Sequence, residues 1–540
     1  MKKTFFIFLF IHLLGFNKPP QETNISPTAI GEVASAHPLA TQAGLAILKQ
    51  GGNAFDAAIA VASTLNVVEP GMSGLGGYGT ILIYSKDENR IRYLNSSGRF
   101  PVATNSDLMR EPTPNFMSNR VGPKSISTPG NLNAWKAMHS EYGRLPWGSL
   151  FEAAIMNAEK GFVVSSSLAF GISRSFEDFS PYTRSFYGSN DAPLKEGDTL
   201  IQKDLANTFR IIQSEGVNSF YRGAIAKQID EQMQQVGSFL ALEDLQNNQA
   251  EWWDPLKMEY RNYEVYTAGL PSNAFAAFVN LGIMRELDPK SLKHNSTRYL
   301  HFLAEMTKES YKARLAYSFD PEIKEAPLDS LLSKEILNEL ASNLSDSAST
   351  FIPPYSPESK NTTHFVVIDR WGNIVSATQT LGNVFGSGIM VEGIGIWMNN
   401  SMAYSTFEPK GNPMDAFPGR HKLSGDCPVI IMKDGKPWAA LGSPGGHTIT
   451  QNVPQIIFNL IDFEMDMQTA IEAPKIAFVE PDIISGDPWH EKSVRDSLTL
   501  LGHKLMPRRI GNAHGIKLLY DSTGQISGYD VGVDRRVNDW

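Results

Sequence analysis

A polar segment of this chain ends abruptly at a pair of threonines that begins an apolar strand. The segment is rich in proline and serine, and Asn361, Thr362 and Thr363 follow it directly. The apolar residues 364–368 predict a strand, and a turn at 371–373 leads into a second predicted strand that ends in threonine. Any fold of this chain must therefore place Thr362 and Thr363 at the start of one of two successive strands.

Threonine at this position has a chemical use if the chain is cut in front of it. Breaking the Asn361–Thr362 peptide bond would give Thr362 a free α-amino group beside its own hydroxyl, and the amine can act as base for that hydroxyl. An α-amino group titrates near pH ~8, closer to neutrality than lysine, so it can accept a proton. From the dipeptide alone, the simpler alternative that two threonines merely begin a strand stays open.

Charge and composition limit the partners of the protein. The 540 residues are 42% hydrophobic and 19% charged, which is typical of a globular protein. The net charge is −9, the pI is about 5.7, and no long basic run occurs. These values argue against a nucleic-acid surface, so we expect a small-molecule partner and no nucleic acid.

The first twenty residues have the pattern of a secretory signal peptide. Lys2 and Lys3 precede an apolar run, 5–16, that is too short to span a bilayer comfortably. We therefore expect residues 1–20 to direct export, to the periplasm or out of the cell, with no other membrane association. Because no A-x-A cleavage site is evident, a short membrane anchor remains the alternative.

The sequence predicts neither a metal nor a cofactor. The single cysteine, Cys427, excludes an intrachain disulfide and a multi-cysteine metal site, and its place at the start of an apolar strand is typical of a small buried residue. No H-E-x-x-H, calcium-loop or P-loop pattern occurs, and the eleven histidines are scattered along the sequence. Ser443 lacks the G-x-S-x-G pattern, which leaves a serine hydrolase as a weak alternative.

Hydrophobic periodicity predicts a layered α/β sandwich in which helices flank antiparallel strands. The predicted helices are 38–50, 54–65 (with Asn53 as its cap), 150–160, 204–215, 225–236, 274–286, 297–317, 331–344, 450–461 and 467–473. The predicted strands are 80–84, 91–94, 263–267, 364–368, 374–378, 429–432 and 439–441. A loop is predicted over 345–357. After a cut at a nearby bond, such a loop would let the new chain ends move apart.

Several short motifs, taken in order, resemble the γ-glutamyltransferase family of N-terminal nucleophile hydrolases from about Ala34 to Trp540. The matching motifs are His37-Pro38-Leu39-Ala40, Gly51-Gly52-Asn53-Ala54-Phe55-Asp56-Ala57-Ala58, Val68-Glu69-Pro70, Ser73-Gly74-Leu75-Gly76-Gly77, Asn361-Thr362-Thr363-His364 and Gly442-Ser443-Pro444-Gly445-Gly446.

The resemblance implies a four-layer αββα sandwich that cleaves itself between Asn361 and Thr362. The larger chain would span 21–361, and the smaller chain, 362–540, would begin with the nucleophile and form a heterodimer with it. Thr362 would attack a small amide or peptide, nominally a γ-glutamyl compound such as glutathione, to give an acyl-enzyme that water or an amine resolves. Thr380 matches the supporting threonine, and Gly445 and Gly446 match the oxyanion-hole glycines.

The positions that would read the substrate depart from the family pattern. Ser97 stands where the family has an arginine, unless Arg99 has shifted into that role, and Ser401 and Tyr404 replace the residues that hold the α-amino group. The serine pair of the family is altered to Ser424 and Gly425. Asn383 completes the list of candidate substrate-binding residues. These changes predict an altered specificity, with an acylase or small-amide amidohydrolase as one alternative and an inactive secreted binding protein as another.

Overall fold

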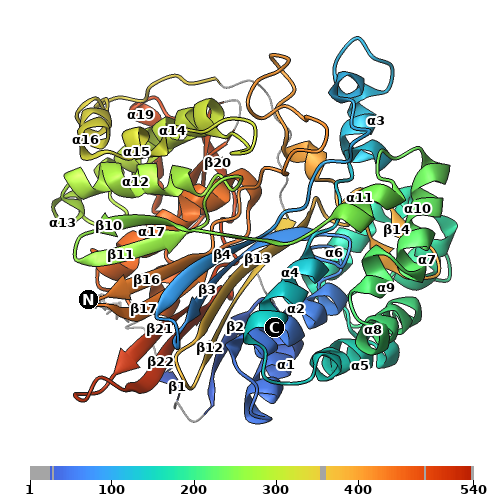
Figure 1. Cartoon of the computed structure of the whole chain (residues 1–540). Coiled ribbons are helices and arrows are strands. Elements are labelled where there is room, and N and C mark those ends of the chain that lie inside the picture. The colour runs from blue at the N-terminus through green and yellow to red at the C-terminus, as the bar shows by residue number, and fades with distance from the viewer. Residues whose placement is uncertain (1–24, 27–29, 353–360, 480–481, 537–540) are drawn as a thin grey trace, which may run out of the picture.

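Two antiparallel sheets stack face to face between layers of helices (Figure 1). The computed structural model describes residues 25–26, 30–352, 361–479 and 482–536. The six-stranded sheet has the order β2 (Gly31–Ser35), β12 (Asn361–Asp369), β13 (Ile374–Gly382), β3 (Tyr78–Ser85), β4 (Arg90–Ser96) and β9 (Glu251–Trp253). The seven-stranded sheet has the order β1 (Ile25–Ser26), β22 (Ile526–Val533), β21 (His514–Tyr520), β17 (Lys436–Gly442), β16 (Val429–Lys433), β11 (Tyr263–Thr267) and β10 (Leu256–Tyr260).

Strand β12 shows why residues 365–368, just after the threonine pair, are continuously apolar. Phe365 and Val367 pack into the core beneath the first helical layer, whereas Val366 and Ile368 pack into the core that the two sheets share. A strand that is buried on both faces needs apolar residues at every position. Thr362 lies two residues before His364 on the face that points to the second sheet, because side chains alternate along a strand.

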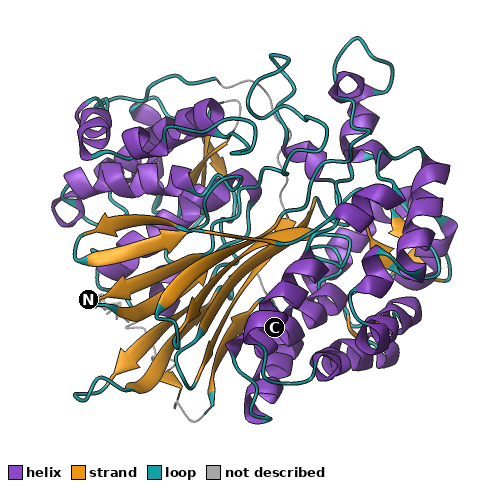
Figure 2. Ribbon diagram, in the orientation of Figure 1, coloured by secondary structure: helices purple, strands orange, loops and turns teal. Residues whose placement is uncertain are grey.

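Helices cover the outer face of each sheet (Figure 2). The first layer contains α1 (Pro38–Lys49), α2 (Ala54–Val68), α4 (Asn131–Tyr142), α5 (Glu152–Lys160) and α8 (Lys203–Glu215). The second contains α12 (Phe275–Glu286), α14 (Thr297–Tyr317), α16 (Lys334–Ser342), α17 (Ile449–Ile461) and α18 (Met467–Glu472). Beside these layers lie α3 (Phe116–Val121), α6 (Ser166–Ser175), α7 (Pro181–Tyr187), α9 (Asn218–Tyr221), α10 (Ala224–Val236), α11 (Leu242–Asn247), α13 (Pro289–Leu292), α15 (Leu328–Leu331) and α19 (Lys492–Leu500).

Short strands complete the described part of the chain. They are β5 (Phe162–Val163) with β8 (Thr199–Leu200), β6 (Gly188–Ser189) with β7 (Ala192–Pro193), β14 (Met390–Val391) with β15 (Ile396–Trp397), and β18 (Ile476–Val479), β19 (Ile483–Gly486) and β20 (Leu505–Pro507) in one small sheet.

The predicted αββα sandwich is confirmed, and its helices and strands begin and end within a few residues of expectation. Asn53 caps α2 as predicted, accepting hydrogen bonds from the N–H groups of Phe55 and Asp56. One helix differs, because the predicted 331–344 shortens to α16, and Leu331 ends the separate short helix α15. Ser333 caps α16 by accepting from the N–H of Ile336, and a capping serine starts a new helix rather than continuing the old one.

Two predictions concern residues that lie wholly or partly outside those that the structure describes. These are the signal peptide at 1–20 and part of the predicted loop, 353–357, whereas 345–350 is a loop as expected. Within the ranges that the structure describes, no helix is both long enough and apolar enough to cross a membrane.

Candidate active site

Thr362 lies at an irregular point in the pairing of β12 with β13. Asn361 pairs with Gly382 and Thr363 with Gln379, so the regular register is interrupted at the residue between them. The irregularity places Thr362 opposite Thr380 and Leu381, near the C-terminal end of β13. Thr362 is only 4% exposed, and it lines a cavity of about 170 Å³.

Thr380 holds the carbonyl group of the predicted scissile bond. Its hydroxyl donates a hydrogen bond of 2.5 Å to the carbonyl oxygen of Asn361 and accepts one of 2.8 Å from the N–H of Gly382. A donor on this oxygen stabilises the negative charge that develops there when a nucleophile attacks the carbonyl carbon. The arrangement can therefore assist attack by the adjacent Thr362 hydroxyl on its own peptide bond.

The second threonine of the pair contacts an acid that the sequence analysis left without a role. Thr363 Oγ1 donates to Glu69 Oε2 over 2.7 Å, from β12 to the residue that ends α2. Burial raises the pKa of Glu69 to about 7, although the hydrogen bond from Thr363 opposes the shift. A carboxyl group that can hold or release a proton near neutral pH thus lies one residue from Thr362.

The predicted oxyanion glycines form the turn between β17 and α17. Gly445 has φ +139° and Gly446 has φ +60°, backbone conformations that residues other than glycine rarely adopt. Gly445 lines the same cavity as Thr362. Its carbonyl oxygen accepts from the N–H of Thr448 at 3.2 Å and from the Thr448 hydroxyl at 2.9 Å, which fixes the turn beside the threonine.

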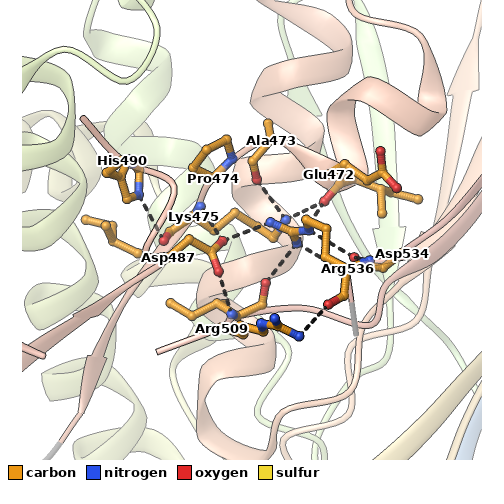
Figure 3. A network of polar contacts seen from close by, with 12 residues as sticks. Glu472, Ala473, Pro474, Lys475, Asp487, His490, Arg509, Asp534 and Arg536 are labelled. Atoms are coloured by element: carbon orange, nitrogen blue, oxygen red, sulfur yellow. Dashed lines mark hydrogen bonds and ion pairs between the residues drawn. The ribbon is translucent and has the colours of Figure 1, made fainter. Parts of the chain in front are cut away.

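A network of buried charges supports the opposite wall of the cavity (Figure 3). The wall is the segment 508–512, and Asp487 accepts from the N–H of Ile510 at 2.8 Å and from Arg536 at 3.0 Å. Asp487 also accepts from the N–H of Lys475, whose ammonium is buried among backbone carbonyls, and burial lowers the pKa of this lysine to about 8. The wall is therefore held by several charge-assisted hydrogen bonds rather than by surface contacts.

Asn383 and Ser401 lie close to the scissile residue. The amide oxygen of Asn400 accepts from the N–H of Asn383 at 2.8 Å, and the N–H of Asn400 donates to Leu381 at 2.9 Å. Both contacts are at the end of β13, where Gly382 pairs with Asn361. Ser401 follows Asn400 and begins a short 3₁₀ turn that ends at Tyr404.

Tyr404 and Ser424 lie beside the oxyanion turn. The ring of Tyr404 packs on His447 with 4.4 Å between centroids. A Cβ added to Gly425 would lie 2.6 Å from the Tyr404 hydroxyl and 2.7 Å from the carbonyl oxygen of Gly446. Since Gly425 directly follows Ser424, these predicted substrate-binding residues and Gly446 occupy one buried region.

None of the predicted substrate-binding residues is among those that line the cavity of Thr362, which holds for Ser97, Arg99, Asn383, Ser401, Tyr404 and Ser424 alike. Ser97 is fully buried, and its hydroxyl donates to the carbonyl of Gly79. The guanidinium of Arg99 forms ion pairs with Glu251 at 3.0 Å and Glu322 at 2.6 Å. Two carboxylates thus already neutralise Arg99, and the structure gives no support to its shift into the role of the missing arginine.

Comparison with known proteins now adds the family. Residues 40–538 match the model of the gamma-glutamyltranspeptidase family. The chain belongs to this family. It is similar to the glutathione hydrolase proenzyme of Bacillus subtilis (strain 168), with 34% identity over 91% of this chain and 88% of that protein. It is also similar to the acylase ACY 1 proenzyme of Pseudomonas sp. (strain SE83), with 32% identity over 91% of this chain and 90% of the relative.

A solved structure agrees with the family assignment. The crystal structure of cephalosporin acylase from Bacillus halodurans superposes with a TM-score of 0.86 at 27% identity, over 98% of each chain. As a gamma-glutamyltranspeptidase family member with this fold, the protein is an autoprocessing N-terminal nucleophile enzyme, a hydrolase or acyltransferase of amides. The inactive-scaffold and serine-hydrolase alternatives are not supported.

Observations at two other residues that the sequence analysis considered, Ser443 and Cys427, fit this family assignment. The Ser443 hydroxyl donates to the adjacent carbonyl of Pro444, and burial raises the pKa of Cys427 to about 12, so that its thiol stays protonated. The histidines are scattered along the sequence, yet ring nitrogens of His301 and His503 lie 2.8 Å apart although 202 residues separate the two. The fold brings them together, which no local pattern in the sequence reveals.

The sequence analysis missed a buried lysine in the substrate region of this family member. Lys422 is 1% exposed, and its ammonium lies 3.4 Å from the centre of the Tyr78 ring. Asp426, 3% exposed, accepts from the Thr80 hydroxyl at 3.2 Å. Burial lowers the pKa of Lys422 and raises that of Asp426, while their mutual attraction opposes both shifts. The sequence does offer one signal for this pair, because Lys422 and Asp426 are two charged residues within a short segment that leads into the buried strand β16.

Proposed function

We propose that Thr362 is the nucleophile of this enzyme and that self-cleavage of the Asn361–Thr362 bond creates it. The observation that carries the proposal is the hydrogen bond from Thr380 to the Asn361 carbonyl, which activates that bond in the uncut chain. Attack by the Thr362 hydroxyl would replace the peptide bond with an ester, and water would then release residues 21–361 as the larger chain. Residues 362–540 would form the smaller chain, and residues 1–20 would have directed export.

The same groups would then act on an external amide. The free α-amine of Thr362 would accept the hydroxyl proton while the hydroxyl attacks the acyl carbonyl, and the proton would pass to the departing amine. The oxyanion would face the glycine turn at 445–446, and water or an acceptor amine would resolve the acyl-enzyme. Glu69 would position the start of β12 through Thr363.

The acyl donor is nominally a γ-glutamyl compound such as glutathione, as the names of several relatives indicate for those proteins. A second candidate, an acylase or amidohydrolase without γ-glutamyl specificity, is favoured by one observation. Arg99 is committed to Glu251 and Glu322, so it does not supply the charge that Ser97 lacks.

Trapping of the acyl-enzyme tests the role of Thr362. The purified protein is mixed with an acyl p-nitroanilide, quenched in acid during turnover, and digested for mass spectrometry. We expect the acyl mass on the peptide that begins with Thr362. An acyl group on another residue, such as Ser443, would refute the proposal.

A further inference from the structure

Two histidines and a glutamate are buried together between α14 and the end of α19. His301 and Glu305 lie one turn apart on α14, so their side chains leave the same face of this helix. His503 follows α19, and α14 and α19 lie side by side (Figure 1). The three residues are at most 4% exposed, and one nitrogen or oxygen atom of each lies within 4.8 Å of the others. We call these three residues the His-Glu cluster.

The hydrogen bonds of His301 leave a lone pair that faces His503. Its Nε2 atom lies 2.7 Å from the carbonyl oxygen of Ser345, which can only accept, so Nε2 carries the hydrogen of the neutral ring. The lone pair is then on Nδ1, 2.8 Å from Nε2 of His503. A histidine that binds a metal usually donates its other ring N–H to a group such as a backbone carbonyl, which fixes the tautomer. His301 is held in this way.

His503 is neutral and has one nitrogen directed at the His-Glu cluster. Burial lowers its pKa to about 4, so its ring is uncharged at neutral pH, and the uncharged imidazole is the form that binds metals. Within the described residues, the contact with His301 is the only hydrogen bond of this ring, because its Nδ1 atom has no partner there. Nε2 of His503 can therefore either share a proton with His301 or bind a metal ion.

The charges around the His-Glu cluster favour a cation. Glu305 accepts from the ammonium of Lys308 at 2.9 Å and from the N–H of Ser349 at 3.2 Å. Lys308 also lies 4.0 Å from one oxygen of Asp482, and the other oxygen of Asp482 lies 3.7 Å from the exposed Lys504. Solvent screens the charge of Lys504. The two carboxylates outnumber the one buried ammonium, which leaves a net negative charge beside the two neutral histidines.

We propose that His301, Glu305 and His503 bind a zinc ion that links α14 to the segment after α19. Two imidazoles and one carboxylate are a ligand set that zinc accepts, with water in the fourth position. Two nitrogens on one zinc ion are about 3.4 Å apart in a tetrahedral site, so the two rings would separate only slightly from the present 2.8 Å. In the cleaved enzyme, the ion would take two ligands from the larger chain and one from the smaller chain.

The same side chains hold the segment 345–349, which precedes the scissile bond in the sequence. Ser345 is bound by His301, and Ser349 is bound by Glu305 and, through its carbonyl, by Lys308 at 2.6 Å. A zinc ion would fix the side chains that make these contacts, and with them the position of the segment. The ligands are present whether or not the chain is cut, so the inference does not depend on the proposed function.

Zinc titration of the purified, chelator-treated protein tests the inference. Competition with a chromophoric chelator gives the affinity, and elemental analysis gives the amount bound. We expect one equivalent of zinc per protein and no competition from Mg²⁺, which prefers oxygen ligands. His503→Asn should weaken zinc binding at least about 100-fold, since changes outside the ligand set alone cost about 10–100-fold. Glu305→Gln keeps the size of the side chain and should also weaken zinc binding.

The matched control is His294→Asn, which replaces a half-buried histidine that contacts Asn459 away from the His-Glu cluster. It should bind zinc as the wild type does. Zinc should raise the Tm of the wild type and of His294→Asn, because a ligand that binds only the folded state stabilises it, and should leave the Tm of His503→Asn unchanged.

Three results would overturn the inference. They are a wild-type protein that binds no zinc, an equal response of the wild type to Mg²⁺, and a His503→Asn or Glu305→Gln variant with wild-type affinity for zinc. In each case, the two histidines would share only a hydrogen bond.

Discussion

The Thr380 hydroxyl donates its one proton to the Asn361 carbonyl and accepts the N–H of Gly382, so both of its hydrogen-bonding roles are in use. A residue this close to the scissile bond influences cleavage through a single hydrogen-bonding group. Its substitution should therefore change rates while the fold is kept.

Thr380→Val keeps the shape of the side chain but removes the hydroxyl. We expect self-cleavage to slow about 100-fold, because one oxyanion donor is lost. Thr380→Ser, which retains the hydroxyl, should cleave at nearly the wild-type rate. A time course on denaturing gels measures both rates, and equal rates for the valine and serine variants would show that the hydrogen bond has no part in cleavage.

Gly425→Ala should disturb the oxyanion turn. The added methyl group would lie 2.6 Å from the Tyr404 hydroxyl and 2.7 Å from the Gly446 carbonyl, distances that require one of them to move. A displacement of this kind lowers kcat by about 100-fold when it misplaces a catalytic group. Gly269→Ala is the control, since its nearest neighbour would be at an ordinary 3.5 Å. Similar kcat values for the two variants would contradict the placement of the turn.

At the scale of elements, local sequence patterns were sufficient for most helices and strands but not for the hairpin β21–β22. Gly515 and Gly532 pair within this hairpin, and glycine in a strand weakens the sequence signal. Their use is in packing, because Met467 of α18 approaches within 2.8 Å of a Cβ placed at either glycine. This packing requirement is set by α18, a different element, so the sequence of the hairpin alone does not reveal it.

The substrate region was predicted only in part for a similar reason. Motif positions located Ser401, Tyr404 and Ser424, which are all buried, but they give no sign of the ion pairs that Arg99 forms. Its partner Glu251 is 152 residues away and Glu322 is 223 residues away. Lys422 was overlooked because its burial depends on Tyr78 of β3, and on segments that no single motif contains.

His421, which directly precedes Lys422, connects its segment to two other elements. It is buried and binds Asp320, beyond α14, and Glu251 of β9. Burial lowers its pKa, but the two carboxylates outweigh burial and raise the pKa to about 9. Because the folded pKa exceeds the usual ~6.5, this contribution to stability is complete below about pH 6.5 and is lost as pH rises through 9.

Thermal unfolding of wild type and His421→Asn between pH 6 and pH 10 checks this expectation. The difference in Tm between the two proteins should be largest at pH 6 and should shrink toward pH 10. A difference that stays constant across this range would show that His421 is not charged in the folded protein.

For the whole molecule, the fold interleaves the two proposed chains in both sheets. Strands β12 and β13, from the smaller chain, lie between β2 and β3 of the larger chain. In the other sheet, β16 pairs with β11, and β22 pairs with β1. Separating the chains would break backbone ladders and expose both cores.

We therefore expect the cleaved chains to elute as one species in gel filtration and to separate only in denaturant. Denaturing electrophoresis of the same fraction should show two bands. Elution of the two chains in separate peaks without denaturant would contradict the interleaved arrangement.

The position of the self-cleavage is the central claim, and intact-mass spectrometry with N-terminal sequencing of the purified protein tests it most directly. The account predicts two chains in the wild-type protein, the smaller beginning with Thr362, and one uncut chain in Thr362→Ala. A wild-type protein that stays a single chain, or a smaller chain that begins at any other residue, would contradict it.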